Sequence, residues 1–181
     1  MTIPMEELRS LFTSKRWRLR RPAPGAAEQV ARRLGCSPVL GRVLESRGDG
    51  RPEEFVRSSP DQITPPWAFA GMEEAVERLL RALEGGEQAL IHGDFDADGI
   101  TSAALLYLGL SRVGFQELKV ELEDRSRGHG LNRGVVERAI REELALIITT
   151  DCGISDPDYV AELERNGVNV IVTDHHRPLP R

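Results

Sequence analysis

The sequence contains no hydrophobic run long enough to cross a membrane, and its first residues, Met-Thr-Ile-Pro-Met-Glu-Glu, show no signal-peptide pattern. Its two cysteines, Cys36 and Cys152, are too few for a disulfide framework, which is typical of a reducing compartment. Internal repeats and low-complexity tracts are missing. So are a Walker sequence and a Rossmann glycine fingerprint, which disfavours nucleotide binding by backbone amides alone. We expect a cytoplasmic protein without membrane contacts.

The composition is that of an ordinary globular protein, but the charge is unevenly distributed. The 181 residues are 40% hydrophobic and 29% charged, which allows one full domain and an additional segment. Residues 1–50 carry ten Lys or Arg against five Asp or Glu, whereas the remaining residues carry fourteen against twenty-four. This pattern indicates either a solvated basic helix before an ordinary acidic domain, or a polyanion-binding arm beside an acidic metal site.

Hydrophobic periodicity divides the chain into two parts. Residues 1–85 are predicted to be a helical N-terminal region, with a loop at 58–66 and helices at 5–12, 25–34, 38–44 and 72–83. From residue 86, strands predicted at 89–92, 118–122, 144–149 and 168–173 alternate with helices at 100–113, 133–143 and 157–166. This order predicts an α/β fold with a Rossmann-like parallel sheet. Four strands are few for such a sheet, so we expect residues 86–181 to be the first part of a larger domain.

The loop after the first of these strands is the most informative segment. It reads Asp94-Phe95-Asp96-Ala97-Asp98-Gly99. In an extended segment alternate carboxylates share one face, and Gly99 allows the backbone to turn into the next helix. Carboxylates gathered in this way require a cation. The alternative is a calcium loop of the EF-hand type, but a strand precedes this loop, and its twelfth position is Leu105 instead of glutamate.

Two further strands also end in potential metal ligands. Asp151 follows the third strand, and Asp174-His175-His176 follows the fourth. An Asp after a strand is also typical of a helix N-cap, and a His–His pair can be incidental. Because the carboxyl ends of parallel strands meet at one edge of a sheet, we expect these groups to lie close to the first loop. Oxygen and nitrogen donors gathered there suit divalent metal ions.

A loop with two arginines follows the second strand. It reads Asp124-Arg125-Ser126-Arg127-Gly128-His129-Gly130. Arginines between glycines are suited to contacting phosphate groups, and the alternative is a flexible solvated turn.

These segments together resemble the DHH phosphoesterase superfamily. The resemblance is carried by Gly-Asp-Phe-Asp-Ala-Asp-Gly-Ile-Thr-Ser, the Arg…Gly-His-Gly-Leu loop, Thr-Thr-Asp-Cys-Gly-Ile-Ser and Val-Thr-Asp-His-His-Arg-Pro-Leu-Pro, in this order and spacing. Within the superfamily, the chain is most similar to the 5′→3′ exonucleases specific for single-stranded DNA. The match extends into the N-terminal part at Trp17, at 44–48 and at the helix at 72–83.

The resemblance implies two Mn²⁺ or Mg²⁺ ions and a role for each matching residue. The implied metal ligands are Asp96, Asp98, Asp151, His175 and His92, and Asp94 and His176 would assist catalysis. Arg125, Arg127 and His129 would bind substrate. The chain departs from the family pattern at Glu123 and His129, where proline and tyrosine are common. The family's later aspartate ligand and its second domain would lie beyond Arg181.

The implied activity is 5′→3′ hydrolysis of single-stranded DNA in repair and recombination. The implied partners are a RecQ-type helicase and single-strand-binding protein, and Trp17 in the basic arm would stack on a base. Because residues 86–181 would be only the N-terminal part of the DHH catalytic domain, we expect residues 1–181 alone to be weakly active or inactive. The alternatives are a DHH phosphodiesterase of short RNA or cyclic dinucleotides and a non-catalytic fragment that binds DNA or protein.

Overall fold

The computed structural model describes residues 6–9, 16–19, 22–47, 51–57 and 59–178. It divides into two compact units, residues 1–64 and residues 65–181. Among the described residues, no helix is long and apolar enough to cross a membrane.

The first unit begins with a pair of strands where a helix was predicted. Strands β1 (Glu6–Arg9) and β2 (Arg16–Leu19) pair antiparallel, with Leu8 opposite Trp17. The prediction of a helix over 5–12 is therefore wrong at 6–9, and its other residues lie outside the described ones. A helix of eight residues is marginal without tertiary packing, whereas pairing with a second strand satisfies the backbone groups.

Two helices form the packed part of the first unit. Helices α1 (Ala26–Leu34) and α2 (Pro38–Arg47) bury Ala27, Val30, Ala31 and Leu44. Gly41 makes this packing possible, because a Cβ there would overlap the backbone carbonyl of Ala27. The short helix α3 (Pro52–Val56) follows, and the guanidinium of Arg47 lies 4.3 Å from the ring centroid of Phe55. The turn η1 (Pro60–Gln62) interrupts the segment that was predicted to be loop.

The second unit contains the predicted parallel sheet, with the strand order β4-β3-β5-β6. All three strand pairs are parallel, which confirms the α/β fold. The strands are β3 (Ala89–Gly93), β4 (Leu118–Leu122), β5 (Leu146–Thr150) and β6 (Asn169–Thr173). The helices are α4 (Met72–Gly85), α5 (Ala97–Val113), α6 (Arg133–Arg141) and α7 (Pro157–Arg165), and the short turns are η2 (Pro66–Ala68) and η3 (Arg125–Arg127).

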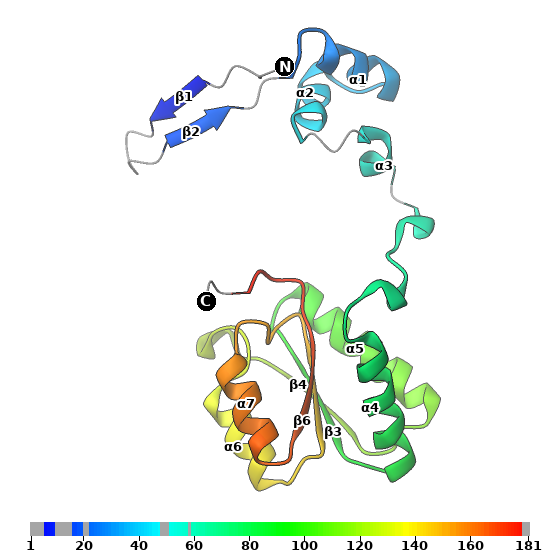
Figure 1. The fold of residues 1–181 in the computed structure, drawn as a ribbon, viewed down its shortest axis with the longest axis vertical. Helices are drawn as coiled ribbons and strands as arrows, with labels where there is room; N and C mark the ends of the chain where they lie inside the picture. Colours follow the sequence, from blue (N-terminus) through cyan, green and yellow to red (C-terminus); the bar gives the residue numbers. More distant parts are fainter. Residues whose placement is uncertain (1–5, 10–15, 20–21, 48–50, 58, 179–181) are drawn as a thin grey trace. The chain divides into compact units, whose positions relative to one another are not determined.

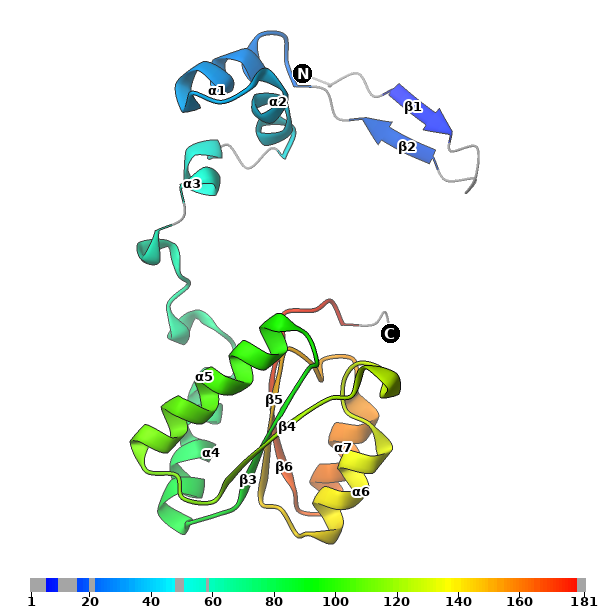
Figure 2. The same ribbon diagram turned by 180° about the vertical axis from the view of Figure 1, so that it is seen from behind.

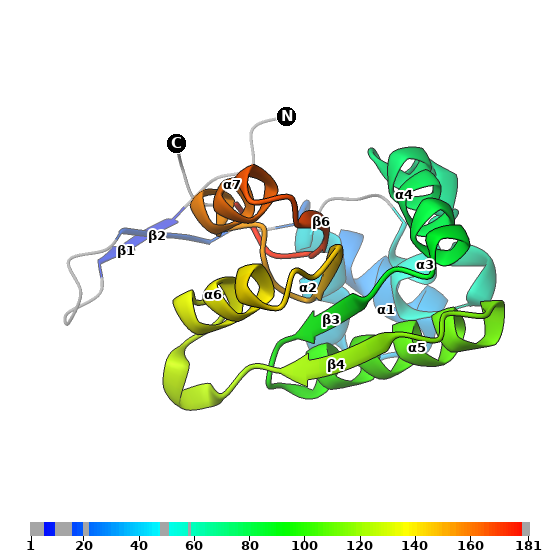
Figure 3. The same cartoon turned by 90° about the horizontal axis from the view of Figure 1, so that it is seen from below.

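Helices cover both faces of this sheet, as Figures 1 and 2 show. Helices α4 and α5 lie on one face and α6 and α7 on the other, an arrangement also visible in Figure 3. Side chains alternate along each strand: Leu90 and Ile147 pack on the α6–α7 side, whereas Ile91 and Ile148 pack on the α4–α5 side. The central strands are therefore buried on both faces, as their continuous apolar sequences predict.

Helix α4 belongs with the sheet in the structure. Ala82 of α4 is fully buried in the cluster beneath α5. The guanidinium of Arg78 donates to the backbone carbonyl of Ala145 at 3.0 Å and to the side chain of Asn169. The structural division at Thr64 and Pro65 therefore precedes α4. The division of the chain into a helical region, 1–85, and a catalytic part, 86–181, stays a prediction.

Candidate metal centre

Three strand ends meet at the carboxyl edge of the sheet. Gly93, Thr150 and Thr173 are in register at the ends of β3, β5 and β6. The ladder continues one residue further, because the N–H of Asp94 donates to Thr150 O at 3.3 Å and the N–H of Asp151 donates to Thr173 O at 2.9 Å. The acidic residues that follow the strands are thus held side by side by backbone hydrogen bonds.

Asp151 is the buried acid of this edge. Asp151 is 6% exposed, and neither of its carboxylate oxygens has a hydrogen-bond partner. Its φ of 61° lies in the left-handed region, which Asp tolerates better than most residues. Burial raises the pKa of this carboxyl, and the negative charges of Asp98 and Asp96 raise it further. A buried carboxylate with free oxygens is a suitable cation ligand.

Asp96 and Asp98 lie at the start of α5, which begins at Ala97. Asp96 is the N-cap, and its carboxylate accepts a hydrogen bond from the N–H of Gly99 at 3.2 Å. This bond is the principal reason that the pKa of Asp96 is lowered. Asp98 is exposed in the first helical turn. The prediction of an extended segment with a helix from residue 100 is wrong here, because the Asp96 cap starts the helix three residues earlier.

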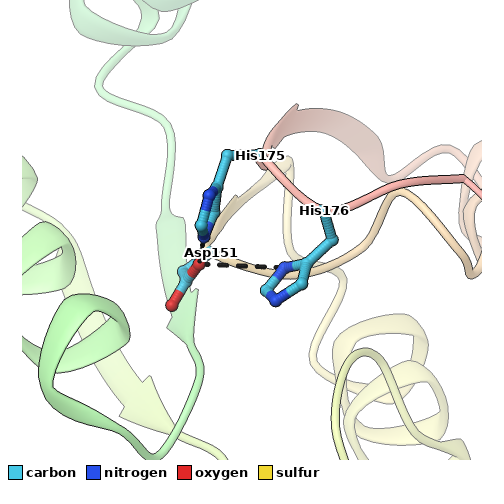
Figure 4. A group of neighbouring side chains, drawn as sticks. All are labelled: Asp151, His175 and His176. Carbon is cyan, nitrogen blue, oxygen red and sulfur yellow. Dashed lines mark ion pairs between the residues drawn. The ribbon is translucent and has the colours of Figure 1, made fainter. Parts of the chain in front are cut away.

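The two histidines after β6 both face Asp151, as Figure 4 shows. His175 Nε2 lies 2.8 Å from Asp151 Oδ1 and 3.9 Å from Asp98 Oδ2. His176 Nδ1 lies 3.8 Å from the same Asp151 oxygen, but it is hydrogen-bonded to Asp174 Oδ1 at 2.8 Å. The bond to Asp174 raises the pKa of His176.

Asp174 is a fixed acceptor for this edge. It accepts hydrogen bonds from the N–H of Ile154 and the N–H of His176, both at 3.0 Å. Partial burial alone would raise its pKa, but these hydrogen bonds and the His176 ring outweigh burial, so the pKa of Asp174 is lowered. Asp174 therefore orients His176, whose Nε2 is left for another partner.

Among the described residues, two groups of side chains bring their donor atoms within 4.8 Å of one another. One comprises Asp151, His175 and His176, and the other comprises Asp94, Asp96 and Asp151. Asp151 is common to both groups. Since buried oxygens of Asp94 and Asp151 lack hydrogen-bond partners, the donor set fits divalent cations. A cleft of about 370 Å³ opens beside this edge, lined by Asp98, Ser102, Asp151, Thr173, Asp174 and His175.

The predicted ligand His92 lies beneath this edge, inside the sheet. Its ring is fully buried, with Nε2 3.4 Å from both Glu123 Oε2 and the carbonyl of Gly130. It is in neither group of converging donors, although its Nδ1 has no hydrogen-bond partner. Glu123, whose importance was not predicted, also accepts a hydrogen bond from Asn132 Nδ2 at 2.6 Å. Its only signal in the sequence was its departure from the family pattern.

The arginine loop after β4 lies beside the acidic loop. The guanidinium of Arg125 lies 5.0 Å from the ring centroid of Phe95, between Asp94 and Asp96 in sequence. His129 Nδ1 lies 3.0 Å from Asp94 Oδ1, and its ring meets the His176 ring edge-on at a centroid distance of 4.7 Å. The side chain of Arg127 lies outside the part of the chain that the structure describes.

Cys152, directly after Asp151, is an unreactive neighbour of this centre. It is fully buried, with Sγ 3.8 Å from the carbonyl of His92. Burial raises the pKa of its thiol to about 12, and nearby carboxylates, Asp174 first, add to the effect. The thiol therefore stays protonated and is not a nucleophile at neutral pH.

Comparisons with known proteins assign this chain to one family. The sequence profile of the DHH family, N-terminal domain, matches residues 88–181. Single-stranded-DNA-specific exonuclease RecJ from Haemophilus influenzae is 38% identical over 142 residues, which make up 78% of this chain and 24% of that protein. This chain spans about a quarter of the length of the curated relatives it matches.

Solved structures lead to the same family. RecJ from Thermus thermophilus in complex with Mn²⁺ matches with a TM-score of 0.59 at 30% identity, over 90% of this chain and 23% of that one. A crystal structure of exonuclease RecJ bound to manganese matches with a TM-score of 0.56 at 39% identity, over 61% of this chain and 29% of that one. Relatives with this fold have thus been crystallised with manganese.

Proposed function

Because the chain belongs to the DHH family, as a RecJ-like protein that covers the N-terminal part of RecJ, we propose that it serves metal-dependent hydrolysis of phosphodiester bonds in single-stranded DNA. The observation that carries this proposal is the buried carboxylate of Asp151, which accepts no hydrogen bond and converges with the rings of His175 and His176. A site of this kind needs cations, and phosphodiester hydrolysis is chemistry for which paired divalent ions are suited.

The residues would divide the work as follows. Asp96, Asp98, Asp151 and His175 would hold two Mn²⁺ or Mg²⁺ ions, with His92 as a further predicted ligand. Bound ions of this kind supply an activated water and stabilise the leaving oxygen. His176, whose ring is hydrogen-bonded to Asp174, would give a proton to the leaving group from Nε2. Asp94 would assist from the floor of the site, where it is 3% exposed.

The arginine loop would bind the substrate. Arg125 is exposed beside Phe95, so its guanidinium can pair with a backbone phosphate near the centre. Arg127 and His129 complete the predicted substrate set. The basic residues before residue 50 would extend the contact with the DNA backbone, and Trp17 would stack on a base. The 5′→3′ direction and the cytoplasmic partners, a RecQ-type helicase and single-strand-binding protein, follow from the family resemblance.

Two other functions remain as alternatives. A DHH phosphodiesterase of short RNA or cyclic dinucleotides would use the same edge. A non-catalytic fragment would bind DNA or protein without cutting it. Since residues 1–181 correspond to about a quarter of the relatives' length, we propose that these residues by themselves are weakly active or inactive.

A substrate panel tests this proposal. The purified chain is incubated with Mn²⁺ and 5′-labelled single-stranded DNA, duplex DNA, short RNA or a cyclic dinucleotide. We expect slow loss of single-stranded DNA only, and we expect Asp98→Ala to abolish it while DNA affinity stays within about threefold, because Asp98 is an exposed ligand. Preferred cleavage of a cyclic dinucleotide would favour the first alternative, and DNA binding with neither cleavage nor Mn²⁺ binding would favour the second. Rapid digestion would contradict the proposed weakness of residues 1–181.

A further inference from the structure

Glu123 is a buried acid that the proposed function does not use. It follows β4 directly, and its side chain is 2% exposed. Its backbone N–H donates to the carbonyl of Gly93 at 2.8 Å, so Glu123 is held against the end of β3, where the acidic loop begins. A carboxylate is costly to bury unless hydrogen bonds satisfy it, so the partners of this one indicate its role.

The two carboxylate oxygens of Glu123 bind both ends of the arginine loop. Oε1 accepts the N–H of Asp124, which starts the loop, at 3.0 Å. Oε2 accepts Nδ2 of Asn132, which follows the loop, at 2.6 Å. The buried ring of His92 lies 3.4 Å from both Oε2 and the carbonyl of Gly130. One side chain thus bridges the two ends of the loop.

Asn132 is suited to this bridge because its amide has both an acceptor and a donor. Its Oδ1 accepts the N–H of Val135 at 3.2 Å as the N-cap of α6, which leaves Nδ2 to donate to Glu123. Aspartate would cap the helix about as well, but it would place a second carboxylate against Glu123. Substitution can therefore separate the bridge from the cap.

The loop that Glu123 bridges meets the acidic loop at two points. The guanidinium of Arg125 lies 5.0 Å from the ring centroid of Phe95, and His129 Nδ1 lies 3.0 Å from Asp94 Oδ1. Arg125 and His129 are both exposed. Because packing around exposed side chains is weak, the backbone of the loop must set where these two residues stand.

We infer that Glu123 is a positioning residue that holds the arginine loop beside the acidic loop, so that Arg125 and His129 face the DNA next to the metal centre. The inference rests on the proposed function, in which this loop binds single-stranded DNA. Glu123 lies in neither group of converging donors and acts through the loop. Its negative charge by itself would repel DNA, so positioning and simple electrostatics predict opposite effects of removing it.

The first test measures the affinity of the 181-residue chain for labelled single-stranded DNA in the presence of Mn²⁺. Glu123→Gln removes the charge, and its amide donor then meets the amide donor of Asn132. We expect the affinity for DNA to fall about tenfold, because the bridge is broken. Glu117→Gln is the matched control, since it removes the same charge at an exposed residue directly before β4. The control should bind DNA as tightly as wild type or slightly more tightly.

A reversed pair tests whether the bridge itself matters. Asn132→Asp alone should weaken DNA binding about as much as Glu123→Gln does, because two carboxylates then meet. Combining Glu123→Gln with Asn132→Asp exchanges donor and acceptor, keeps a good N-cap and restores the net charge. We expect the double variant to bind DNA within about threefold of wild type. Calorimetry should find Mn²⁺ affinity within about threefold of wild type in all these variants, because neither residue belongs to the converging donors.

Hydrogen exchange provides a readout that does not depend on DNA. Amides of residues 124–131 should exchange about tenfold faster in each single variant, while those of β5 stay unchanged, and the double variant should recover. Unchanged exchange and DNA affinity in Glu123→Gln, a double variant no better than the single ones, or an equal loss of Mn²⁺ affinity would overturn the positioning role and leave the proposed function in place. If wild type binds neither Mn²⁺ nor single-stranded DNA, the proposed function fails, and exchange still decides whether Glu123 holds the loop.

Discussion

Asp96 and Asp151 are the same amino acid at the ends of neighbouring strands, but the fold treats them in opposite ways. Asp96 is exposed and accepts the N–H of Gly99, and its pKa is lowered. Asp151 is buried without a hydrogen-bond donor, and its pKa is raised. Hydrogen bonds, first among them the one from the N–H of Gly99, stabilise the charge of Asp96, whereas the rings of His175 and His176 offset the burial of Asp151 only in part. The comparison indicates that Asp151 reports most directly on metal binding.

The largest expected effect comes from Asp151→Asn. This change keeps the shape of the side chain and a residue type that tolerates positive φ, but it removes the charge. We expect Mn²⁺ affinity to fall by about 100-fold, while the metal-free protein gains about 1 kcal/mol of stability because a buried charge that the two histidines offset only in part is gone. Calorimetry with Mn²⁺ and urea unfolding measure the two effects. A variant that loses both metal affinity and stability would show that Asp151 is a structural residue.

The packing under the Asp96 loop can be tested with two glycines of the same helix. A Cβ at Gly99 would lie 2.5 Å from the carbonyl oxygen of Asp94, whereas at Gly109 it would meet nothing within 4 Å. We expect Gly99→Ala to cost about 1–3 kcal/mol of unfolding free energy, since backbone must move. Gly109→Ala should instead stabilise by about 0.5–1 kcal/mol. Equal effects in urea unfolding would mean that α5 starts elsewhere.

Two substitutions of Asp96 distinguish its structural role as the N-cap of α5 from the role of its charge. Asp96→Ala removes the side-chain acceptor for Gly99 N–H and should cost about 0.5–2 kcal/mol. Asp96→Asn keeps a good N-cap and should cost little, yet it should weaken Mn²⁺ binding because a carboxylate ligand is lost. Thermal unfolding and metal titration of the two variants measure these effects. If Asp96→Asn were as unstable as Asp96→Ala, the side chain of Asp96 would not act as the N-cap.

The smallest expected effect is a pH dependence of the metal-free protein. The folded pKa of Asp151 is above its ordinary value of 3.8, so the folded state binds the proton more tightly than the unfolded state does. Stability from this group is therefore present below pH 3.8 and lost as pH rises through the raised pKa. Melting temperatures of wild type and Asp151→Asn should diverge across this window, with wild type falling relative to the variant. A constant difference would mean that the pKa is not raised.

The sheet was predictable because three of its strands contain apolar runs, β4 alternates apolar and charged residues, and helices separate the strands. Strand β4 (Leu118–Leu122) was predicted to the residue, and the other three differ at their ends by two residues or fewer. The antiparallel pairing of β1 and β2 was missed, because 6–9 show no alternation and the alternation at 16–19 spans only four residues, too few to distinguish a strand from a connector.

The candidate site was predictable only where strands end. Placing Asp151 and His175 at one edge follows from parallel topology. The approach of His129 to Asp94 depends on the conformation of the loop after β4. Hydrophobic periodicity does not predict the conformation of a loop. The burial of His92 against Glu123 likewise depends on a loop that the sequence leaves open.

The burial of the Cys152 thiol keeps a reactive sulfur away from the candidate metal centre. Zinc and oxidants both react with sulfur in its thiolate form, and a thiol with a pKa of about 12 offers almost none of that form in the cell. An accessible thiolate beside these carboxylates would favour capture of zinc, or irreversible damage by peroxide. Because this sulfur is buried, only the neighbouring carboxylate oxygens and imidazole nitrogens are available to bind metal ions.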